Sequence, residues 1–370
     1  MSFSFGFTKD DFSDDEIDES SLLQPTQLQS EQHLNQPHQN PLDTLIIDPK
    51  SAPQLHTLDS ILSKLENVRI SFDNYTTPIG QSLVYRRELF DVKHQIMTED
   101  DQGQEDGSNR EKLNELLIEE NNSDLQKNEY EGGFKSWECA YDTVDKLCNL
   151  IENEGFLDQV KSVLEFGCGT SLPSCLILMK KLQLKNKNEM NLILSDFNYD
   201  VLRLVTLPNI LIHWASTLPV EQLHNLTTSE QNPVFHNDEI LITPLLIQEF
   251  KNSLQLFNIN ISFVSGSWGR QFNKLIQEAN IDFIISSETI YSRETLPIVA
   301  ESIKEILSNS QANNSRCLLA AKNIYFGVGG SVIEFLNYFN KIKTDKFQVE
   351  VEEINDSQLK RSLVNIVYYK

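Results

Sequence analysis

Two short segments constrain the fold of this chain more than any other feature. Residues 162–173 read SVLEFGCGTSLP, and residues 193–198 read ILSDFN after a gap long enough for a helix. The first is an apolar, strand-like run that ends in Glu165 and two closely spaced glycines, which permit positive φ and a close approach of the backbone to a ligand. The second run brings Asp196 to the same edge of a parallel sheet, where a carboxylate can accept both hydroxyl protons of a ribose. Together they predict an α/β fold that binds a nucleoside-bearing cofactor.

Two alternatives compete for the glycine turn. A dinucleotide-binding fold would place a third glycine three residues after Gly169, but residue 172 is leucine. That fold also has no acid within the turn, whereas this chain has Glu165 there. The dehydrogenase interpretation is therefore disfavoured. The other alternative, an ordinary strand-to-helix turn without a ligand, stays open on this motif alone.

All seven glycines after residue 160 belong to three clusters, and each cluster follows a strand-like run. In an open α/β sheet the ligand lies at the carboxyl ends of the strands, so the clusters predict one shared crevice. The clusters are Gly167 and Gly169; Gly266 and Gly269; and Gly327, Gly329 and Gly330.

The order of strand-like and helical patterns predicts the architecture. Five apolar runs from residue 162 to residue 321 alternate with helical patterns, and the chain closes with two strand-like runs at 347–351 and 363–369. This order predicts an α/β fold with a seven-stranded, mostly parallel, Rossmann-like sheet and an antiparallel C-terminal edge. Ser331 and Glu334 have the spacing of a capping box for the last helix.

Acidic residues are concentrated near the amino terminus. Residues 1–60 carry eleven acidic and two basic residues, and residues 97–130 carry eleven and three, which accounts for 17 of the 23 net negative charges. We predict three regions on this basis. They are an acidic, mostly disordered tail (1–55), a helical extension (56–135) with an acidic linker near 97–128, and the main domain (136–370), with an insert at about 217–257 that contains an apolar helical stretch from 239 to 257.

Several classes of protein are disfavoured by what the sequence lacks. The amino terminus has no basic region followed by an apolar core, so no signal peptide is predicted, and no apolar run has the length of a membrane span. The five cysteines are odd in number and lack the spacing of a metal site. We therefore predict a reducing compartment and no bound metal.

Four motifs in sequence order resemble those of the seven-β-strand S-adenosylmethionine methyltransferases: EFGCG at 165–169, Asp196, GSWG at 266–269 and SSETIY at 286–291. Three longer strings narrow the resemblance. YEGGFKSWEC (130–139), LRLVTLPN (202–209) and AKNIYFGVGG (321–330) are similar to those of the histidine protein methyltransferases of fungi and animals, which modify a histidine in the third protein of the large ribosomal subunit.

The resemblance implies an enzyme that transfers a methyl group from S-adenosylmethionine to a histidine imidazole of this ribosomal protein and so supports ribosome biogenesis and translation. It further implies a monomeric protein of the cytoplasm and nucleus, with no membrane contact and no direct binding of nucleic acid. Neutral imidazole has a lone pair near physiological pH, so the chemistry requires mainly that the nucleophile be held in line with the methyl group.

Matching positions assign residues to roles. Glu288 is the first candidate for a catalytic group and Tyr291 the second, although Glu288 could equally brace the crevice loop. The residues implied to hold the cofactor are Ser136, Trp137, Glu138, Cys139, Glu165, Gly167, Gly169, Asp196, Phe197, Asn198, Gly266, Ser267, Trp268 and Ser286. Those implied to approach the protein substrate are Tyr325, Phe326, Gly327, Gly329 and Gly330.

Other functions remain as alternatives. A lysine-directed protein methyltransferase would share the cofactor motifs. An RNA methyltransferase is disfavoured because the chain is strongly acidic and has SETIY, not Asn-Pro-Pro-Tyr, at 287–291. A noncatalytic ribosome-assembly module is the third alternative. Loss of the cofactor residues would favour it, but this chain retains them.

Overall fold

The computed structural model describes residues 39–101, 132–228, 234–325, 329–354 and 359–370. The part described below is the compact unit from Asn40 to Lys370. The predicted tail as far as residue 38, and the predicted acidic linker from residue 102 onward, lie outside the described residues. Within the described ranges, no helix combines the length and the apolar character needed to cross a membrane.

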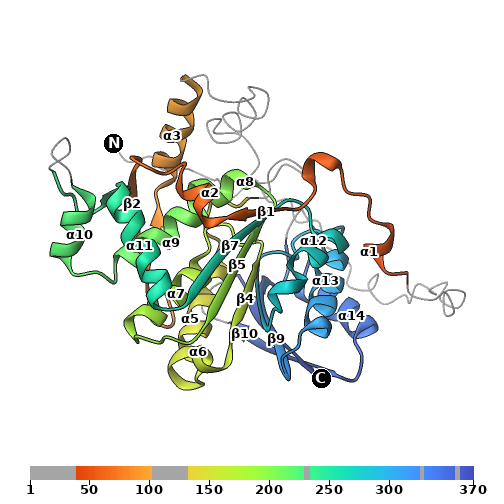
Figure 1. Cartoon of the computed structure of the whole chain (residues 1–370). Coiled ribbons are helices and arrows are strands. Elements are labelled where there is room, and N and C mark those ends of the chain that lie inside the picture. Colours follow the sequence, from red (N-terminus) through yellow and green to blue (C-terminus); the bar gives the residue numbers. More distant parts are fainter. Residues whose placement is uncertain (1–38, 102–131, 229–233, 326–328, 355–358) are drawn as a thin grey trace, which may run out of the picture. The chain divides into compact units, whose positions relative to one another are not determined.

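A twisted sheet forms the centre of the unit and has helices on both faces (Figure 1). Its eight strands among the described residues lie in the order β1 (Gln54–Thr57), β7 (Ile259–Ser265), β5 (Met190–Asp196), β4 (Ser162–Phe166), β8 (Phe283–Ser287), β9 (Asn314–Lys322), β11 (Arg361–Tyr369) and β10 (Phe347–Ile354). The five strands from β7 to β9 are parallel, and β11 is antiparallel to both of its neighbours, β9 and β10. All seven predicted strands are confirmed, with the antiparallel C-terminal edge, and β1 is an eighth strand that the sequence did not predict.

The two faces of the sheet carry separate apolar cores, because successive residues of a strand point to opposite faces. Val163 and Leu194 enter one core, and Leu164 and Ile193 enter the other. Helices α5 (Glu138–Asn153), α6 (Phe156–Gln159), α7 (Leu172–Gln183), α9 (Leu207–Ala215) and α11 (Pro244–Leu256) cover the first face. Helices α12 (Arg270–Ile276), α13 (Leu296–Asn309) and α14 (Val332–Ile342), with the short η5 (Gln277–Ala279), cover the second.

The capping box predicted for α14 forms only in part. The Ser331 hydroxyl accepts a hydrogen bond from the Glu334 amide at 3.0 Å, as predicted. The Glu334 carboxylate does not return to the amide of Ser331 but contacts Arg293 at 3.1 Å. The helix therefore begins at the predicted residue with one of the two predicted hydrogen bonds.

The extension before the main domain was predicted to be helical, and this prediction is wrong in part. The extension contributes two strands to a second, three-stranded sheet. Its order is β3 (Leu83–Arg87), β2 (Arg69–Thr76) and β6 (Glu239–Leu241), flanked by the helices α2 (Leu58–Leu62) and α3 (Leu89–Asp101). Two amides of β3 donate to buried side chains of α9: Tyr85 N to His213 Nε2 at 3.1 Å, and Arg87 N to Asn209 Oδ1 at 2.7 Å. The edge of this sheet is thus satisfied by side chains distant in sequence, which no local pattern can reveal.

The insert at 217–257 supplies α10 (Val220–Thr227), the strand β6 and α11. The helix predicted from residue 239 begins at Pro244, because the Thr243 hydroxyl accepts from the Leu246 amide at 3.0 Å and fixes the start there. The preceding residues pair with β2.

Residues 40–55, predicted to belong to the disordered tail, are ordered. They form α1 (Pro41–Thr44), η3 (Pro49–Ser51) and the first part of β1. Leu42 is buried, and β1 pairs antiparallel with β7. The prediction was wrong for this stretch because composition averages over a long segment, while a few apolar side chains and one strand pairing suffice to fix a short one.

Candidate functional site

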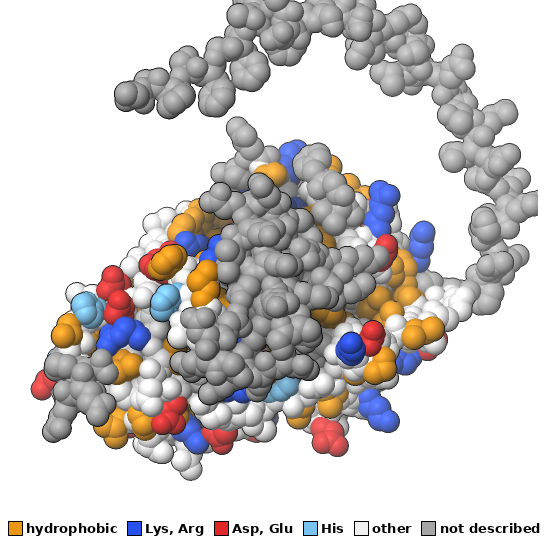
Figure 2. All heavy atoms as spheres, turned by 90° about the horizontal axis from the view of Figure 1, so that it is seen from above, with side chains coloured by type: hydrophobic (Ala, Val, Ile, Leu, Met, Phe, Trp, Pro, Cys, Tyr) orange, Lys and Arg blue, Asp and Glu red, His pale blue; other side chains and the backbone are white. Residues whose placement is uncertain are grey.

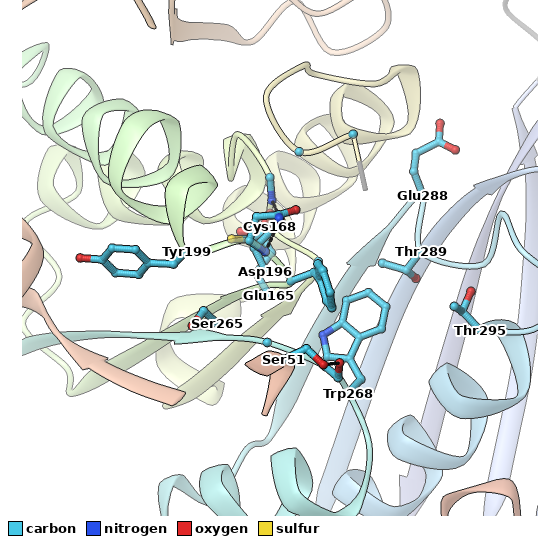
Figure 3. A pocket seen from close by; sticks show the side chains of 18 of the residues that line it. Ser51, Glu165, Cys168, Asp196, Tyr199, Ser265, Trp268, Glu288, Thr289 and Thr295 are labelled. Carbon is cyan, nitrogen blue, oxygen red and sulfur yellow. Dashed lines mark hydrogen bonds between the residues drawn. The ribbon is translucent and has the colours of Figure 1, made fainter. Parts of the chain in front are cut away.

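A cavity of about 920 Å³ lies at the carboxyl ends of β4, β5, β7 and β8. Figure 3 shows Tyr199 and Glu288 on opposite sides of it, with Asp196 and Trp268 between them. Twelve of the residues predicted to form the site line this cavity: Trp137, Glu165, Gly167, Gly169, Asp196, Phe197, Asn198, Gly266, Ser267, Trp268, Glu288 and Tyr291. The predicted crevice is therefore confirmed for the glycine clusters after β4 and β7, whereas Gly329 and Gly330 of the third cluster do not line it.

The turn after β4 has the predicted geometry. Gly167 and Gly169 have φ of 71° and 48°. A Cβ atom on Gly167 would lie 2.8 Å from Thr289 Cγ2, and one on Gly169 would lie 3.2 Å from the Gly133 carbonyl oxygen. Side chains at these two positions would therefore force the neighbouring walls of the cavity apart.

Glu165 lies beneath this turn and supports it. Its carboxylate accepts from the Ser171 hydroxyl at 2.8 Å and from the Ser174 amide at 3.1 Å. Ser171 adopts φ of 54°, a left-handed conformation that is uncommon for a residue other than glycine. Burial raises the pKa of Glu165 to about 7.

Asp196 is held by two main-chain amides at the end of β5. One carboxylate oxygen accepts from Gly169 N and the other from Asn198 N, both at 3.0 Å. An ionised carboxylate has about four acceptor positions in all, a number that suits two amides and the two hydroxyl groups of a ribose. The two segments that first suggested a nucleoside site are thus joined directly through this side chain.

Trp268 provides an aromatic wall after β7. Its ring stacks on Phe166, with centroids 4.3 Å apart and an interplanar angle of 27°. Its indole Nε1 is buried and has no hydrogen-bond partner among the described residues. Because an unpaired buried donor costs free energy, this N–H suits a ligand with acceptor nitrogens, such as adenine.

Glu288 lies at the other end of the cavity, with φ of 58°. Its carboxylate accepts from the Tyr325 hydroxyl and from the Cys139 amide at 3.4 Å, and lies 3.9 Å from Lys322 Nζ. Burial raises the pKa of Glu288, opposed by the hydrogen bond from Tyr325 and by the charge of Lys322. A non-glycine residue in the left-handed region is uncommon, and such conformations cluster at functional sites.

Trp137 and Lys322 meet beside this carboxylate. Lys322 Nζ lies 5.2 Å from the centroid of the Trp137 ring and 2.9 Å from Glu138 Oε2. The resemblance implied that Trp137 holds the cofactor, and an aromatic face suits a sulfonium cation. In the structure the Lys322 ammonium group already lies against that ring.

Several predicted residues lie outside the lining of the cavity. Glu138 and Cys139 contact Lys322 and Glu288 instead. Ser136 bonds Thr170 at 2.9 Å, and Ser286 bonds Thr289 at 2.6 Å, so each supports a residue that does line the cavity.

The glycine segment after β9 packs against the chain itself. Gly330 N donates to the Tyr291 carbonyl at 2.8 Å, and Gly329 forms a β-bridge with Ser292. Tyr325 contacts Glu288 but does not line the cavity. The remaining two predicted substrate-side residues, Phe326 and Gly327, lie outside the described residues. The proposed approach of a protein substrate to this segment stays a prediction.

The sequence missed one whole wall of the cavity. Residues between Leu45 and Gln54 line it, and nothing in their composition indicated this. Other lining residues could have been predicted, because they lie close in the chain to predicted site residues. These are Gly132, Gly133, Lys135, Cys168, Thr170, Tyr199, Ser265 and Thr289. In the part of the chain that the structure describes, no group of three or more His, Cys, Asp or Glu could hold a metal ion.

The chain is similar to known proteins over its full length. Histidine protein methyltransferase 1 of Saccharomyces cerevisiae is 39% identical over 380 residues, which cover 99% of this chain and 98% of that protein. The Schizosaccharomyces pombe protein of the same name is 33% identical over 317 residues, covering 84% and 82%. No protein-family model matches the chain. Among solved structures, an rRNA methylase from Streptococcus thermophilus has 9% identity and a TM-score of 0.32, over 60% of this chain and 95% of that one, a likeness too weak to support a conclusion.

Proposed function

The chain belongs to the histidine protein methyltransferase family and is an enzyme that takes its methyl group from S-adenosylmethionine. We propose that its target is a histidine in the third protein of the large ribosomal subunit. The observation that carries the proposed reaction is the 39% identity over 99% of the chain, together with a cavity that joins a nucleoside end to Glu288. The target itself is proposed from the resemblance of the strings at 130–139, 202–209 and 321–330. The methylation supports ribosome biogenesis and translation, and the protein acts as a monomer in the cytoplasm and nucleus.

The cavity suits this cofactor in size and chemistry. Its volume of about 920 Å³ falls within the usual range for sites that enclose a small molecule. Asp196 offers acceptors for the ribose hydroxyls, and Trp268 offers a ring and an unpaired buried N–H for the adenine. When bound, S-adenosylmethionine supplies a methyl group that is already a good electrophile.

Glu288 orients the target in this proposal. Its carboxylate accepts the N–H of one nitrogen of the target imidazole, which fixes the tautomer and leaves the lone pair of the other nitrogen facing the methyl carbon. Transfer of the methyl group would break its bond to sulfur, leave neutral S-adenosylhomocysteine and make the ring a cation, which the Glu288 carboxylate would stabilise. The ring then returns to neutrality by giving its N–H proton to Glu288, which passes it to solvent. Tyr325 and Lys322 hold the carboxylate in place throughout.

The charge of the chain supports a basic protein partner. The net charge is −23, which favours association with a basic ribosomal protein and disfavours direct contact with nucleic acid. On the face seen in Figure 2, acidic and basic side chains are interspersed wherever described side chains are visible. The attraction therefore comes from the overall charge more than from one patch on this face.

The proposal is tested by mass spectrometry of large-subunit proteins from cells with and without this chain. We expect one histidine of the third large-subunit protein to lose a methyl group in the deleted cells and to regain it with the wild-type enzyme. Glu288→Gln should fail to restore it. The matched control, Glu350→Gln, changes an exposed carboxylate on β10 and should restore it fully.

Each other outcome would contradict the proposal in a recognisable way. Methylation of a different protein would overturn the target, and methylated lysine in place of histidine would overturn the reaction. Methyl groups found in RNA would favour an RNA methyltransferase. Absence of S-adenosylmethionine binding in titration calorimetry would favour a noncatalytic assembly module.

A further inference from the structure

The segment of residues 45–54, which we call the strap, forms one side of the cavity. We propose that the strap is part of the cofactor site and covers the adenosine end of S-adenosylmethionine, with Leu45 and Ile47 as its apolar contacts. The inference depends on the cofactor and not on the identity of the methylated protein. It adds to the site a wall that the strand ends alone do not provide.

Both ends of the strap are fixed to the main domain. At its carboxyl end, β1 pairs with β7, and His56 Nε2 lies 2.7 Å from Ser265 Oγ. Ahead of its amino end, Asp43 forms an ion pair with Arg270 at 2.6 Å. The Asn40 amide donates to Glu301 at 3.2 Å. The strap is therefore a bridge between two anchors, which holds its side chains at a defined place over the cavity.

The loop after β7 is shaped to receive the strap. A Cβ atom on Gly266 would lie 2.7 Å from the Ala52 carbonyl oxygen and 2.9 Å from that of Ser51. The Ser267 amide donates to the Ser51 carbonyl at 2.8 Å. The sequence suggested that Gly266 leaves room for a ligand, but the structure shows that it leaves room for the strap.

The side chains of the strap are arranged to contact a flat apolar ligand. A Cβ atom on Gly269 would lie 3.0 Å from Leu45 Cδ2 and 3.4 Å from Ile47 Cδ1, so both side chains face the loop that carries Trp268. Both are half-buried, whereas the intervening Ile46 is 94% exposed. Leu45, Ile47 and the Trp268 ring thus gather at one end of the cavity (Figure 3 shows Ser51 beside Trp268). A purine has the shape and the apolar faces that such a wall buries.

The first test measures binding of S-adenosylhomocysteine by titration calorimetry, because it needs no protein substrate. Leu45→Ala/Ile47→Ala removes the apolar contacts and should weaken binding roughly tenfold. The matched control is Leu55→Ala, which truncates an exposed apolar side chain on β1 outside the cavity and should bind like the wild type. Equal affinities for the double variant and the control would overturn the proposal.

The second test uses the wild-type protein and does not depend on a variant that folds. Lys50 is exposed on the strap, so trypsin should cut after it in the free protein. Saturating S-adenosylhomocysteine should slow this cut at least roughly fivefold, since the bound ligand holds the strap in place. An unchanged rate of cleavage with ligand bound would refute the strap as a wall of the site. Failure of the wild type to bind at all would overturn the cofactor assignment instead.

Discussion

Replacing Gly330 with alanine tests whether the segment after β9 positions the Glu288 end of the cavity. A Cβ atom at this position would lie 2.5 Å from both the carbonyl carbon and the carbonyl oxygen of Tyr291, and closer still to the Ile290 carbonyl oxygen. These are backbone atoms of the loop that follows β8, so no side-chain rotation can relieve the contact. The two segments must move apart.

The expected cost follows from what that movement breaks. The hydrogen bonds from Gly330 N to Tyr291 O, at 2.8 Å, and from Tyr325 N to Gly330 O, at 3.1 Å, would both weaken. At about 1 kcal/mol for each hydrogen bond and about 1–3 kcal/mol for overpacking, the free energy of unfolding should fall by about 3–5 kcal/mol. For a unit of this size the melting temperature should fall by roughly 4–7 °C.

The effect on activity should be selective. Tyr325 donates to Glu288, so its displacement should lower kcat roughly tenfold or more, while the ends of β5 and β7 that carry Asp196 and Trp268 stay in place. Thermal unfolding, calorimetry with S-adenosylhomocysteine and methylation kinetics at a temperature below the transition would measure these three quantities. Ile333→Ala, on an exposed position of α14, is the control and should match the wild type.

Two results would refute this reasoning. An unchanged melting temperature would mean that the segment does not press on the Tyr291 loop. A loss of cofactor affinity as large as the loss of kcat would mean that the segment supports the nucleoside end and not the Glu288 end.

Three further predictions concern single carboxylates. Asp196→Asn places an amide N–H against a main-chain donor, so the Kd for S-adenosylhomocysteine should rise roughly 10- to 100-fold in calorimetry; an unchanged Kd would exclude the ribose role. Glu288→Gln should lower kcat roughly 100-fold or more and leave that Kd unchanged, whereas equal effects on both would indicate a bracing role. Burial raises the pKa of Glu165 from 4.5 to about 7, so the folded protein retains a proton that the unfolded chain has released. This group's contribution to the free energy of unfolding is therefore lost as pH rises from about 4.5 to 7, a decrease of about 3 kcal/mol. Urea unfolding at a series of pH values should show this decrease for the wild type but not for Glu165→Gln. The same pH dependence in both proteins would contradict the prediction.

Much of the fold was predictable because its signals are local. The seven strands β4, β5, β7, β8, β9, β10 and β11 follow from apolar runs, helped after β4 and β7 by glycines that end them, and both signals depend only on neighbouring residues. The strand β1 could not be predicted in the same way, because its residues are mostly exposed and only its backbone pairing with β7 makes it a strand. The strands β2 and β3 lie in the extension that was predicted to be helical, and they are strands because β2 pairs with both β3 and the distant β6.

The candidate site also combines features that local sequence determines with features that depend on tertiary contacts. The sequence by itself determined that Gly167, Gly169 and Asp196 meet at one edge of the sheet, because strand ends and turn conformations are set locally. It also showed that Gly266 and Gly330 permit a close approach, but it could not show what approaches. Only the tertiary structure decided that the strap lies against Gly266 and the Tyr291 loop against Gly330, because those contacts join segments that the chain brings together only when its core is packed.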